Sequence, residues 1–212
     1  MDTAVGLVKS HLELCGYFVL AELPLRAPDG GGYRDVTDLD IIAVRFPHRP
    51  SALPRRVIRP LEVFLDTDPA LGTIDDGIDV IVGEVKEGKA QLNRPLQRVD
   101  TIAFTLRRVG CCPEEYVGEE AQRIARDGSH TFSMPGGMPC RLRLVVFAGR
   151  ESVDEPGVLT IPLAHCAEFI RRRLGEARDV LAGIHFKDPI LGLYALEEKL
   201  AQRDGAGSGT RN

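Results

Sequence analysis

The chain contains 212 residues, of which 43% are hydrophobic and 27% charged, and these values are typical of a globular protein that buries a substantial core. A formal net charge of −4 excludes a generally basic nucleic-acid-binding protein, so any nucleic-acid partner must be held by a local patch. The chain has no tryptophan and only 6% aromatic residues, which argues against binding by stacking on exposed bases.

The N-terminal residues lack the basic and apolar regions of a signal peptide, and no apolar run is long enough to span a bilayer. The cysteines are odd in number and irregularly spaced, which argues against a disulfide framework. His130 and His165 do not complete a zinc signature with them, and no constellation surrounds any of four histidines: His48, His130, His165 and His185. We therefore expect a soluble, cytoplasmic protein with no membrane partner and with buried, reduced thiols.

The first element is predicted to be a helix, because apolar residues recur on one helical face: Val5, Val8, Leu12 and Cys15. Asp2 or Thr3 can cap its start, and Gly16 can end it. Residues 17–25 are rich in aromatic and branched types, which favours a strand, and Pro24 indicates that this strand lies at an edge.

The next segments predict two further strands. Three consecutive glycines at 30–32 indicate a turn, and residues 36–46 favour a strand, so the simplest arrangement is an antiparallel hairpin. Residues 47–78 form an irregular insertion, with a short strand or packed turn at 61–66. A connection of this length usually carries function. Residues 79–86 are predicted to form the third strand.

Three aspartates precede or begin this third strand, namely Asp75, Asp76 and Asp79. They could hold a second metal ion, but hydrated turn residues explain them better.

Helical spacing returns after the third strand in one apolar stripe: Leu96, Val99, Ile102, Ala103, Leu106 and Val109. Asn93 or Arg94, followed by Pro95, marks the start of this helix, and Gly110 marks its end. A further helix is predicted over residues 113–126.

The C-terminal third of the chain contains two predicted strands and two predicted helices. Residues 141–148 become apolar towards their end, as expected for a buried strand, and residues 158–161 form a shorter one. The next helix has one apolar face: Leu163, Cys166, Phe169 and Ile170. The last helix begins with Asp188 as its cap and Pro189 in its first position, and the tail 204–212 is expected to be disordered.

The predicted fold is an α/β sandwich. Three strands in a meander, followed by a helix and a parallel strand, give a mixed central sheet flanked by helices. The sequence contains no internal repeat. The C-terminal helices either flank this core or form a small appendage to it.

Charged residues interrupt two of the predicted apolar strands, at Asp40 and at Glu84 with Lys86. Such charges are costly unless they are paired, hydrated or bound to metal. Glu84 and Lys86 share one face of their strand because they are two residues apart, and Asp40 would lie beside Glu84 if the second strand pairs with the third. Two adjacent carboxylates favour a divalent cation, and a lysine can orient or deprotonate a water held by it. These are the groups that phosphodiester hydrolysis needs.

This arrangement resembles the PD-(D/E)xK superfamily, also called restriction-endonuclease-like, over roughly residues 3–150. The motif TDLDIIAV is similar to the family's second core strand and implies that Asp40 is a metal ligand. The motif GEVK is similar to the (D/E)xK signature and implies catalytic roles for Glu84 and Lys86, with Val85 contributing its carbonyl to the metal. An E-x-K in a strand is also explained by an ordinary surface ion pair.

The resemblance implies a restriction-endonuclease-like αβββαβ core over residues 1–150, with 151–203 packed on it as a C-terminal strand and helices. It implies a nuclease that uses Mg²⁺ or Mn²⁺ and can act as a homodimer, with DNA a more frequent substrate than RNA in the family. The alternative is a catalytically inactive nucleic-acid-binding or assembly subunit with the same fold. A third hypothesis is an enzyme of unrelated chemistry in which the E-x-K is only structural.

The motif around Asp40 departs from the family pattern, because Leu39 rather than a proline precedes the aspartate. Asp38 points to the same side as Asp40 in a strand and could be the ligand instead. Asp40 is favoured because the apolar run begins immediately after it.

Four further polar residues are secondary candidates: Glu13, Glu22, Gln91 and Asn93. Some family members add an acidic residue from the first helix, which would be Glu13, although this residue lies off the apolar stripe. Glu22 in the first strand is its rival. Family members also use polar residues after the lysine to hold phosphate or water, which would be Gln91 or Asn93, although Asn93 is better explained as a helix cap.

Arginines cluster in two segments: Arg45, Arg49, Arg55, Arg56 and Arg59, and then Arg171, Arg172 and Arg173. They are either solvated faces or contacts to a phosphate backbone, and those of the long insertion are placed to approach such a backbone.

Overall fold

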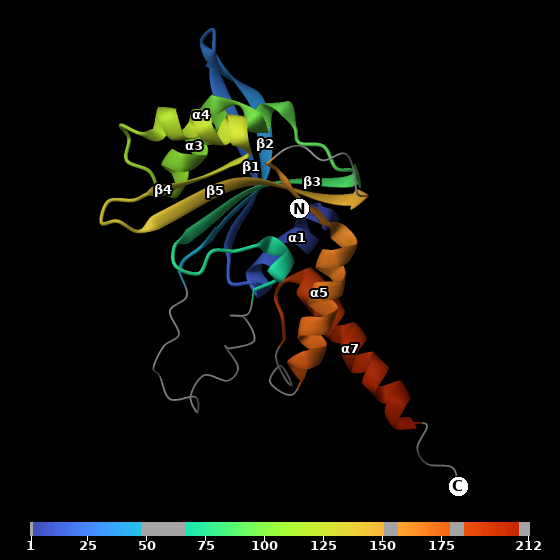
Figure 1. Cartoon of the computed structure of the whole chain (residues 1–212). Coiled ribbons are helices and arrows are strands. Elements are labelled where there is room, and N and C mark those ends of the chain that lie inside the picture. The colour runs from blue at the N-terminus through green and yellow to red at the C-terminus, as the bar shows by residue number, and fades with distance from the viewer. Residues whose placement is uncertain (1, 48–66, 151–156, 179–184, 208–212) are drawn as a thin grey trace.

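The computed structural model of the chain is an α/β fold in which helices cover both faces of a mixed, curled sheet (Figure 1). The structure describes residues 2–47, 67–150, 157–178 and 185–207. Its helices are α1 (Thr3–Leu14), the 3-10 helices η1 (Pro69–Leu71) and η2 (Arg94–Gln97), α3 (Val99–Val109), α4 (Val117–Asp127), α5 (Leu163–Glu176) and α7 (Pro189–Gly207). Its strands are β1 (Phe18–Asp29), β2 (Gly32–Arg45), β3 (Ile78–Lys89), β4 (Ser129–Ser133), β5 (Pro139–Arg150) and β6 (Leu159–Pro162).

The strands follow the order β1-β2-β3-β5-β4, and β6 also pairs with β5. The pairs β1–β2, β2–β3 and β4–β5 are antiparallel, whereas β3–β5 and β5–β6 are parallel. The parallel β3–β5 pair lies in the middle and is buried on both faces, which explains why both strands have nearly continuous apolar runs.

Two hydrophobic clusters lie on opposite faces of the sheet, α3 and α4 covering one and α1 and α5 the other (Figure 1). Alternate residues of each strand enter alternate clusters because successive side chains point to opposite faces. On β3, Ile81 and Val85 pack towards α1 and α5, while Val80 and Val82 pack towards α3 and α4. A charged side chain on such a strand therefore faces one of two densely packed layers.

Local sequence signals predicted several elements correctly. Asp2 caps α1, its Oδ1 accepting hydrogen bonds from the backbone N–H groups of Ala4 at 2.8 Å and Val5 at 3.3 Å. The antiparallel hairpin and the edge position of β1 are confirmed, although both strands extend further towards the turn than predicted. Gly110 ends α3 in the left-handed conformation, at φ 72°.

Other elements differ from the prediction. Strand β4 was not predicted, because it is short and half polar. The α-helix after β3 begins at Val99 instead of near Asn93, because a 3-10 turn that includes Pro95 comes first. Helix α4 begins at Val117, later than predicted. Helix α7 continues to Gly207, past the predicted end at 203.

Some predictions concern residues outside the described ranges. They include the short strand at 61–66, His48, the last residues of the tail, and four arginines of the long insertion: Arg49, Arg55, Arg56 and Arg59.

Asp79 was wrongly interpreted as a hydrated turn residue, because its side chain is fully buried. Its Oδ1 accepts hydrogen bonds from Arg141 Nε at 2.9 Å and Arg143 Nε at 3.2 Å. Its Oδ2 accepts from Arg143 Nη2 at 2.7 Å and from the Tyr17 hydroxyl at 2.5 Å. This network joins the start of β1 to β3 and β5. By contrast, Asp75 and Asp76 are exposed.

The cap of α7 provides a stability prediction. Asp188 Oδ1 accepts from the backbone N–H groups of Ile190 and Leu191, both at 3.0 Å, and from Ser10 Oγ at 2.8 Å. Asp188→Ala is expected to lower the free energy of unfolding by about 1–2 kcal/mol, because it removes a helix cap together with a link to α1. Urea denaturation would measure this change.

Asp35→Ala is the matched control for the cap prediction. Asp35 is 75% exposed and pairs with Arg26 on the hairpin. Its loss is expected to cost no more than about 1 kcal/mol, as for most surface ion pairs. Equal losses in the two variants would contradict a specific capping role for Asp188.

Candidate functional site

The principal candidate site lies where the pairing of β2 with β3 ends. The last paired residues are Ile41 and Gly83, so extending the register by one position places Asp40 opposite Glu84. Asp40 Oδ2 accepts a hydrogen bond of 2.8 Å from the backbone N–H of Val85, and this contact replaces the next bond of the ladder. The two acidic residues are therefore brought together by strand register.

Gly83 permits a close approach at this position. A Cβ atom added there would lie 3.0 Å from Ile41 Cβ and 3.2 Å from Phe147 Cε2, which is tighter than normal packing. The glycine therefore lets β2 and the aromatic ring of β5 pack directly against β3, one residue before Glu84.

Glu84 and Lys86 form an ion pair on one face of β3. The Glu84 side chain is only 3% exposed, whereas that of Lys86 is 40% exposed. The pair therefore joins a buried carboxylate to an amine that reaches solvent. An ion pair was the alternative explanation of the E-x-K motif, and it is present, but it leaves the amine accessible to a ligand.

A third carboxylate lies in the same row across the sheet. The pairs Ala21–Ile41 and Leu23–Leu39 flank Glu22, so the register of β1 with β2 places Glu22 opposite Asp40. Glu22 has φ 54°. It is the only non-glycine residue in the described part of the chain with a positive φ. Positive φ at a residue with a side chain is strained and is often found at functional sites.

Glu22, Asp40 and Lys86, but not the buried Glu84, line an open pocket of about 480 Å³ between the start of α1, the middle of β1 and β2, and the last part of β3. The charged side chains of its lining are five carboxylates and one amine: Asp2, Glu22, Asp38, Asp40, Glu87 and Lys86. The excess of negative charge makes the pocket suited to a cation. It also means that a phosphate could enter only with a cation to neutralise that charge.

Burial alters the acidity of both central carboxyl groups. Burial raises the pKa of Asp40 above its ordinary value, although the hydrogen bond from Val85 N–H and the charge of Lys86 oppose this rise. Burial also raises the pKa of Glu84, against the opposing effect of Lys86. The ionised pair is thus held at a cost that a bound cation would reduce.

Asp38 and the secondary candidates differ in their position relative to this pocket. Asp38 is exposed and lines the same pocket, but it lies two residues from the β3 contact made by Asp40. Glu13 pairs with Lys9 at 2.9 Å and lies roughly 12 Å along α1 from the pocket end of the helix. The structure therefore does not bring Glu13 to this pocket, whereas Glu22 is part of it.

Gln91 and Asn93 follow β3 but are not pocket residues. Gln91 is exposed. Asn93 makes no capping hydrogen bond, so its interpretation as a helix cap was wrong. Its Nδ2 instead donates to Thr37 Oγ1 at 3.5 Å and so holds the η2 segment against β2.

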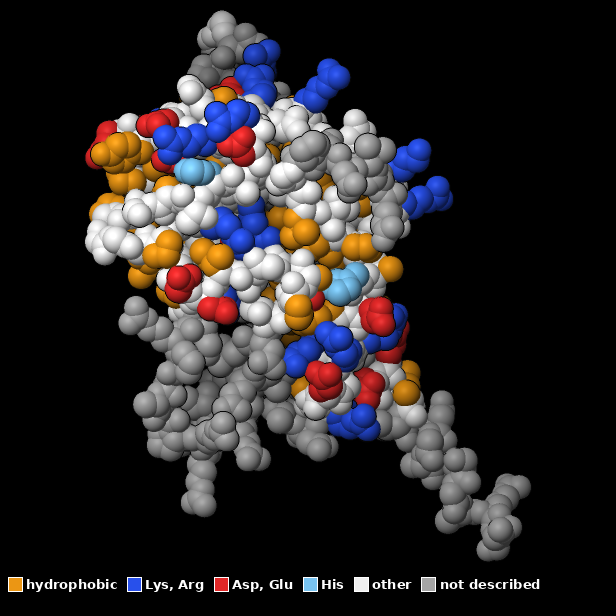
Figure 2. Space-filling view, viewed as in Figure 1, with side chains coloured by type: hydrophobic (Ala, Val, Ile, Leu, Met, Phe, Trp, Pro, Cys, Tyr) orange, Lys and Arg blue, Asp and Glu red, His pale blue; other side chains and the backbone are white. Residues whose placement is uncertain are grey.

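The described arginines of the two clusters are engaged within the protein. Arg45 is buried, and its Nη1 donates to the carbonyl oxygen of Ile74 at 3.2 Å. On α5, the three arginines pair with glutamates of the helical region: Arg171 with Glu197, Arg172 with Glu176 and Arg173 with Glu176. Figure 2 shows positive and negative side chains interspersed over this region, as expected for a solvated face.

Histidine and aspartate side chains meet at a second place in the structure. His11 Nε2 lies 2.8 Å and His165 Nε2 lies 2.6 Å from the same atom, Asp68 Oδ2. Burial alone would raise the pKa of Asp68, but hydrogen bonds from His11, the Ala70 backbone and His165 hold it at about 2. The prediction that His165 has no constellation was therefore wrong.

Sequence reasoning missed this group because its members are far apart in the chain, with Asp68 57 residues from His11 and 97 from His165. The available signal was the position of His11, which falls between Val8 and Leu12 on the buried side of α1. The cysteines gave no such signal. Four of them are buried, as predicted, whereas Cys112 is only half-buried.

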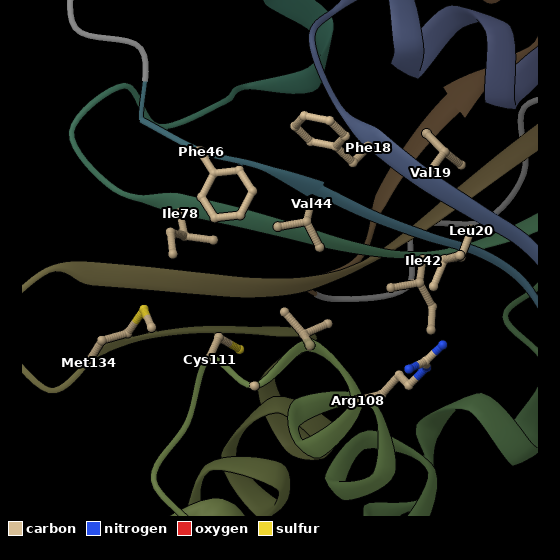
Figure 3. Close-up of a pocket in the computed structure, with 12 residues that line it drawn as sticks. Phe18, Val19, Leu20, Ile42, Val44, Phe46, Ile78, Arg108, Cys111 and Met134 are labelled. Carbon is tan, nitrogen blue, oxygen red and sulfur yellow. The ribbon is translucent and has the colours of Figure 1, made fainter.

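A separate pocket of about 450 Å³ lies between the β1–β2 hairpin and the end of α3 (Figure 3). Its lining is apolar apart from Arg108 and the Cys111 thiol, and Phe18 and Phe46 form its rim with 72% and 54% of their surfaces exposed. It lacks the paired carboxylates of the β2–β3 site and offers no comparable chemistry.

Comparison of the chain with protein-family models, with curated proteins and with solved structures gives no significant match. Within the described residues, no helix combines the length and apolar character needed to cross a membrane.

Proposed function

We propose that the protein is a divalent-metal-dependent nuclease with its centre at Asp40, Glu84 and Lys86. The observation that carries this proposal is the register of β2 and β3, which sets Asp40 opposite Glu84 where the ladder ends, with Lys86 paired to Glu84. The order of α1, three antiparallel strands, α3 and a strand parallel to β3 further supports a restriction-endonuclease-like core. Helix α4 and strand β4 are then additions between α3 and β5.

The residues of the site suit Mg²⁺ or Mn²⁺. These ions prefer oxygen ligands, and the site supplies the carboxylates of Asp40 and Glu84 and the backbone carbonyl of Val85. The negative pocket and the raised pKa values of both carboxyls favour the same conclusion. When bound, such an ion would neutralise charge on the scissile phosphate and lower the pKa of a bound water.

Groups of the protein itself orient the water, the phosphate and the metal ligand. Lys86 is anchored by Glu84 and reaches the pocket wall, where its amine orients the attacking water or a phosphate oxygen. The Val85 N–H fixes the orientation of the Asp40 carboxylate by donating to Oδ2. Phosphodiester bonds of DNA are the proposed substrate, on the basis of the family resemblance.

The direct test is cleavage of plasmid, linear and single-stranded DNA, and of RNA, by purified protein with Mg²⁺ or Mn²⁺. The expected result is cleavage of at least one DNA substrate that a chelator stops and added metal restores. Absence of cleavage on every substrate would favour the alternative, a binding subunit in which the Glu84–Lys86 pair is only structural.

The choice of ligand between Asp40 and Asp38 provides a separate prediction. Asp40→Asn is expected to weaken Mn²⁺ binding and to lower the cleavage rate by about 10²-fold or more, because it removes a carboxylate opposite Glu84. Asp38→Asn preserves the shape of an exposed residue in the same pocket and is expected to change both quantities only weakly. Isothermal titration with Mn²⁺ and cleavage rates would measure the difference, and the reverse ranking would assign the ligand to Asp38.

A further inference from the structure

The group formed by His11, Asp68 and His165 joins three separate elements. His11 lies on α1, Asp68 caps the short helix η1, and His165 lies in the first turn of α5. Asp68 Oδ1 accepts from the backbone N–H of Ala70 at 3.0 Å, so Oδ2 is the oxygen directed at both imidazoles. In Figure 1 the η1 segment lies beside α1 and α5, on the face of the sheet that these helices cover.

The atoms of this group converge as metal ligands do. One nitrogen from each ring and one carboxylate oxygen all lie within 4.8 Å of one another, and in the described part of the chain no other set of three histidine, cysteine or acidic side chains does so. The His11 and Asp68 side chains are 0% and 2% exposed, and that of His165 is 37% exposed. The site is therefore closed on the inside and accessible from the His165 side.

Hydrogen bonding alone accounts incompletely for this arrangement. Two imidazoles share a single carboxylate oxygen, and the other ring nitrogen of His11, Nδ1, is buried without a partner among the described residues. A buried nitrogen in this state costs free energy, so the hydrogen bonds among the described residues leave the His11 ring incompletely satisfied.

The ligand chemistry selects the class of ion. Two imidazole nitrogens with one carboxylate suit zinc and neighbouring transition metals, whereas Mg²⁺ prefers oxygen ligands and keeps several waters. Ligand atoms around tetrahedral zinc lie roughly 3.3 Å apart, given bonds of about 2.0–2.1 Å. Asp68 Oδ2 now lies 2.6 Å from His165 Nε2 and 2.8 Å from His11 Nε2, and each of these two distances would need to widen by only a fraction of an ångström.

We propose that His11, Asp68 and His165 bind a divalent transition-metal ion, with Zn²⁺ as its representative. A water occupies the fourth position on the exposed side of His165. The ion joins α5 to α1 and η1 and so stabilises the attachment of the C-terminal helices to the core. This site is separate from the acidic pocket beside Asp40, because His11 lies roughly 9 Å along α1 from Val5, which lines that pocket.

The test uses the full chain without a histidine tag, stripped of metal by a chelator and then dialysed. Zn²⁺ and, separately, Mg²⁺ are titrated calorimetrically, and the melting temperature is followed with each ion. The wild type is expected to bind one Zn²⁺ at this site and to melt at a higher temperature with Zn²⁺. His165→Ala is expected to weaken that binding by about 100-fold or more and to abolish the thermal shift.

Two further variants make the result specific. His130→Ala removes a histidine that is 31% exposed, close to the exposure of His165, and is expected to retain Zn²⁺ binding. Glu84→Gln alters the other site and should also retain it, so failure of the nuclease proposal and failure of this one are distinguishable. His165→Gln, which keeps a polar side chain, replaces His165→Ala if circular dichroism shows that the alanine variant is unfolded.

Zn²⁺ binding by the wild type that is lost with His165 and retained in both control variants would support the site. No Zn²⁺ binding by the wild type, or equal binding and equal thermal shift in a folded His165 variant, would overturn it.

Discussion

Replacing Lys86 with alanine is expected to lower the rate of metal-dependent cleavage by about 10²–10⁴-fold, the range typical for loss of a positioned acid–base group. The Lys86 side chain is 40% exposed and forms an ion pair with Glu84, so the fold should tolerate its removal. Glu84→Gln is expected to cause at least as large a loss, because it removes a carboxylate of the cation site. Single-turnover cleavage rates with Mn²⁺ would measure both effects.

Lys89→Ala is the matched control for Lys86→Ala. Lys89 lies on the same strand three residues later, is exposed, and does not line the acidic pocket. Its replacement should leave the cleavage rate unchanged. Cleavage that persists in folded Lys86 and Glu84 variants would show that the activity resides elsewhere.

The stability of these variants separates a catalytic role from a structural one. The folded-state pKa of Glu84 is raised above its ordinary value of 4.5, so the stability that this group contributes is present below that pH and is lost as the pH rises through the folded-state value. In metal-free protein at neutral pH, Glu84→Gln should therefore unfold at the same or a higher urea concentration than wild type. A large loss of stability would indicate that the Glu84–Lys86 pair is structural.

Replacing Asp79 with asparagine is expected to lower the free energy of unfolding by about 3–5 kcal/mol, because it leaves the buried arginine charge uncompensated. Asp79 is fully buried, and the Arg143 side chain beside it is only 7% exposed. No other acidic partner of Arg143 is found among the described residues. Such a loss is a large fraction of the total stability of a typical domain and would be measured by urea denaturation.

Asp76→Asn is the control for this change, since Asp76 is exposed and three residues away. It is expected to alter stability by no more than about 0.5 kcal/mol, as for most surface substitutions. An Asp79 variant as stable as the Asp76 variant would mean that water or another group compensates the arginines.

The same network predicts a pH effect. Burial by itself would raise the pKa of Asp79, but its hydrogen bonds and charge interactions with Arg143 and Arg141 hold the pKa below its ordinary value. The stability contributed by Asp79 is therefore present above pH 3.8 and is lost as the pH falls through the lower folded-state value. Acid unfolding of wild type should show this loss, and Asp79→Asn should lack it.

The candidate centre was partly predictable from sequence, because Asp40, Glu84 and Lys86 interrupt apolar strands and a charge there needs an explanation. What alternation along a strand could not provide was the register. A shift of one residue would have separated Asp40 from Glu84, and only the pairing of β2 with β3 decides this. Pairing with β1 likewise decides that Glu22, and not Glu13, lies at the site.

Sequence by itself determined the features that depend on neighbouring residues. The cap of α1 by Asp2, the β1–β2 hairpin, the end of α3 at Gly110 and the cap of α7 by Asp188 all follow from local hydrogen bonding and side-chain periodicity. Only the tertiary structure decided that Asp79 is buried between arginines of β5 and that His11, Asp68 and His165 meet. These contacts join residues that are 57 or more positions apart, and they depend on which faces of the elements pack together, which no local pattern specifies.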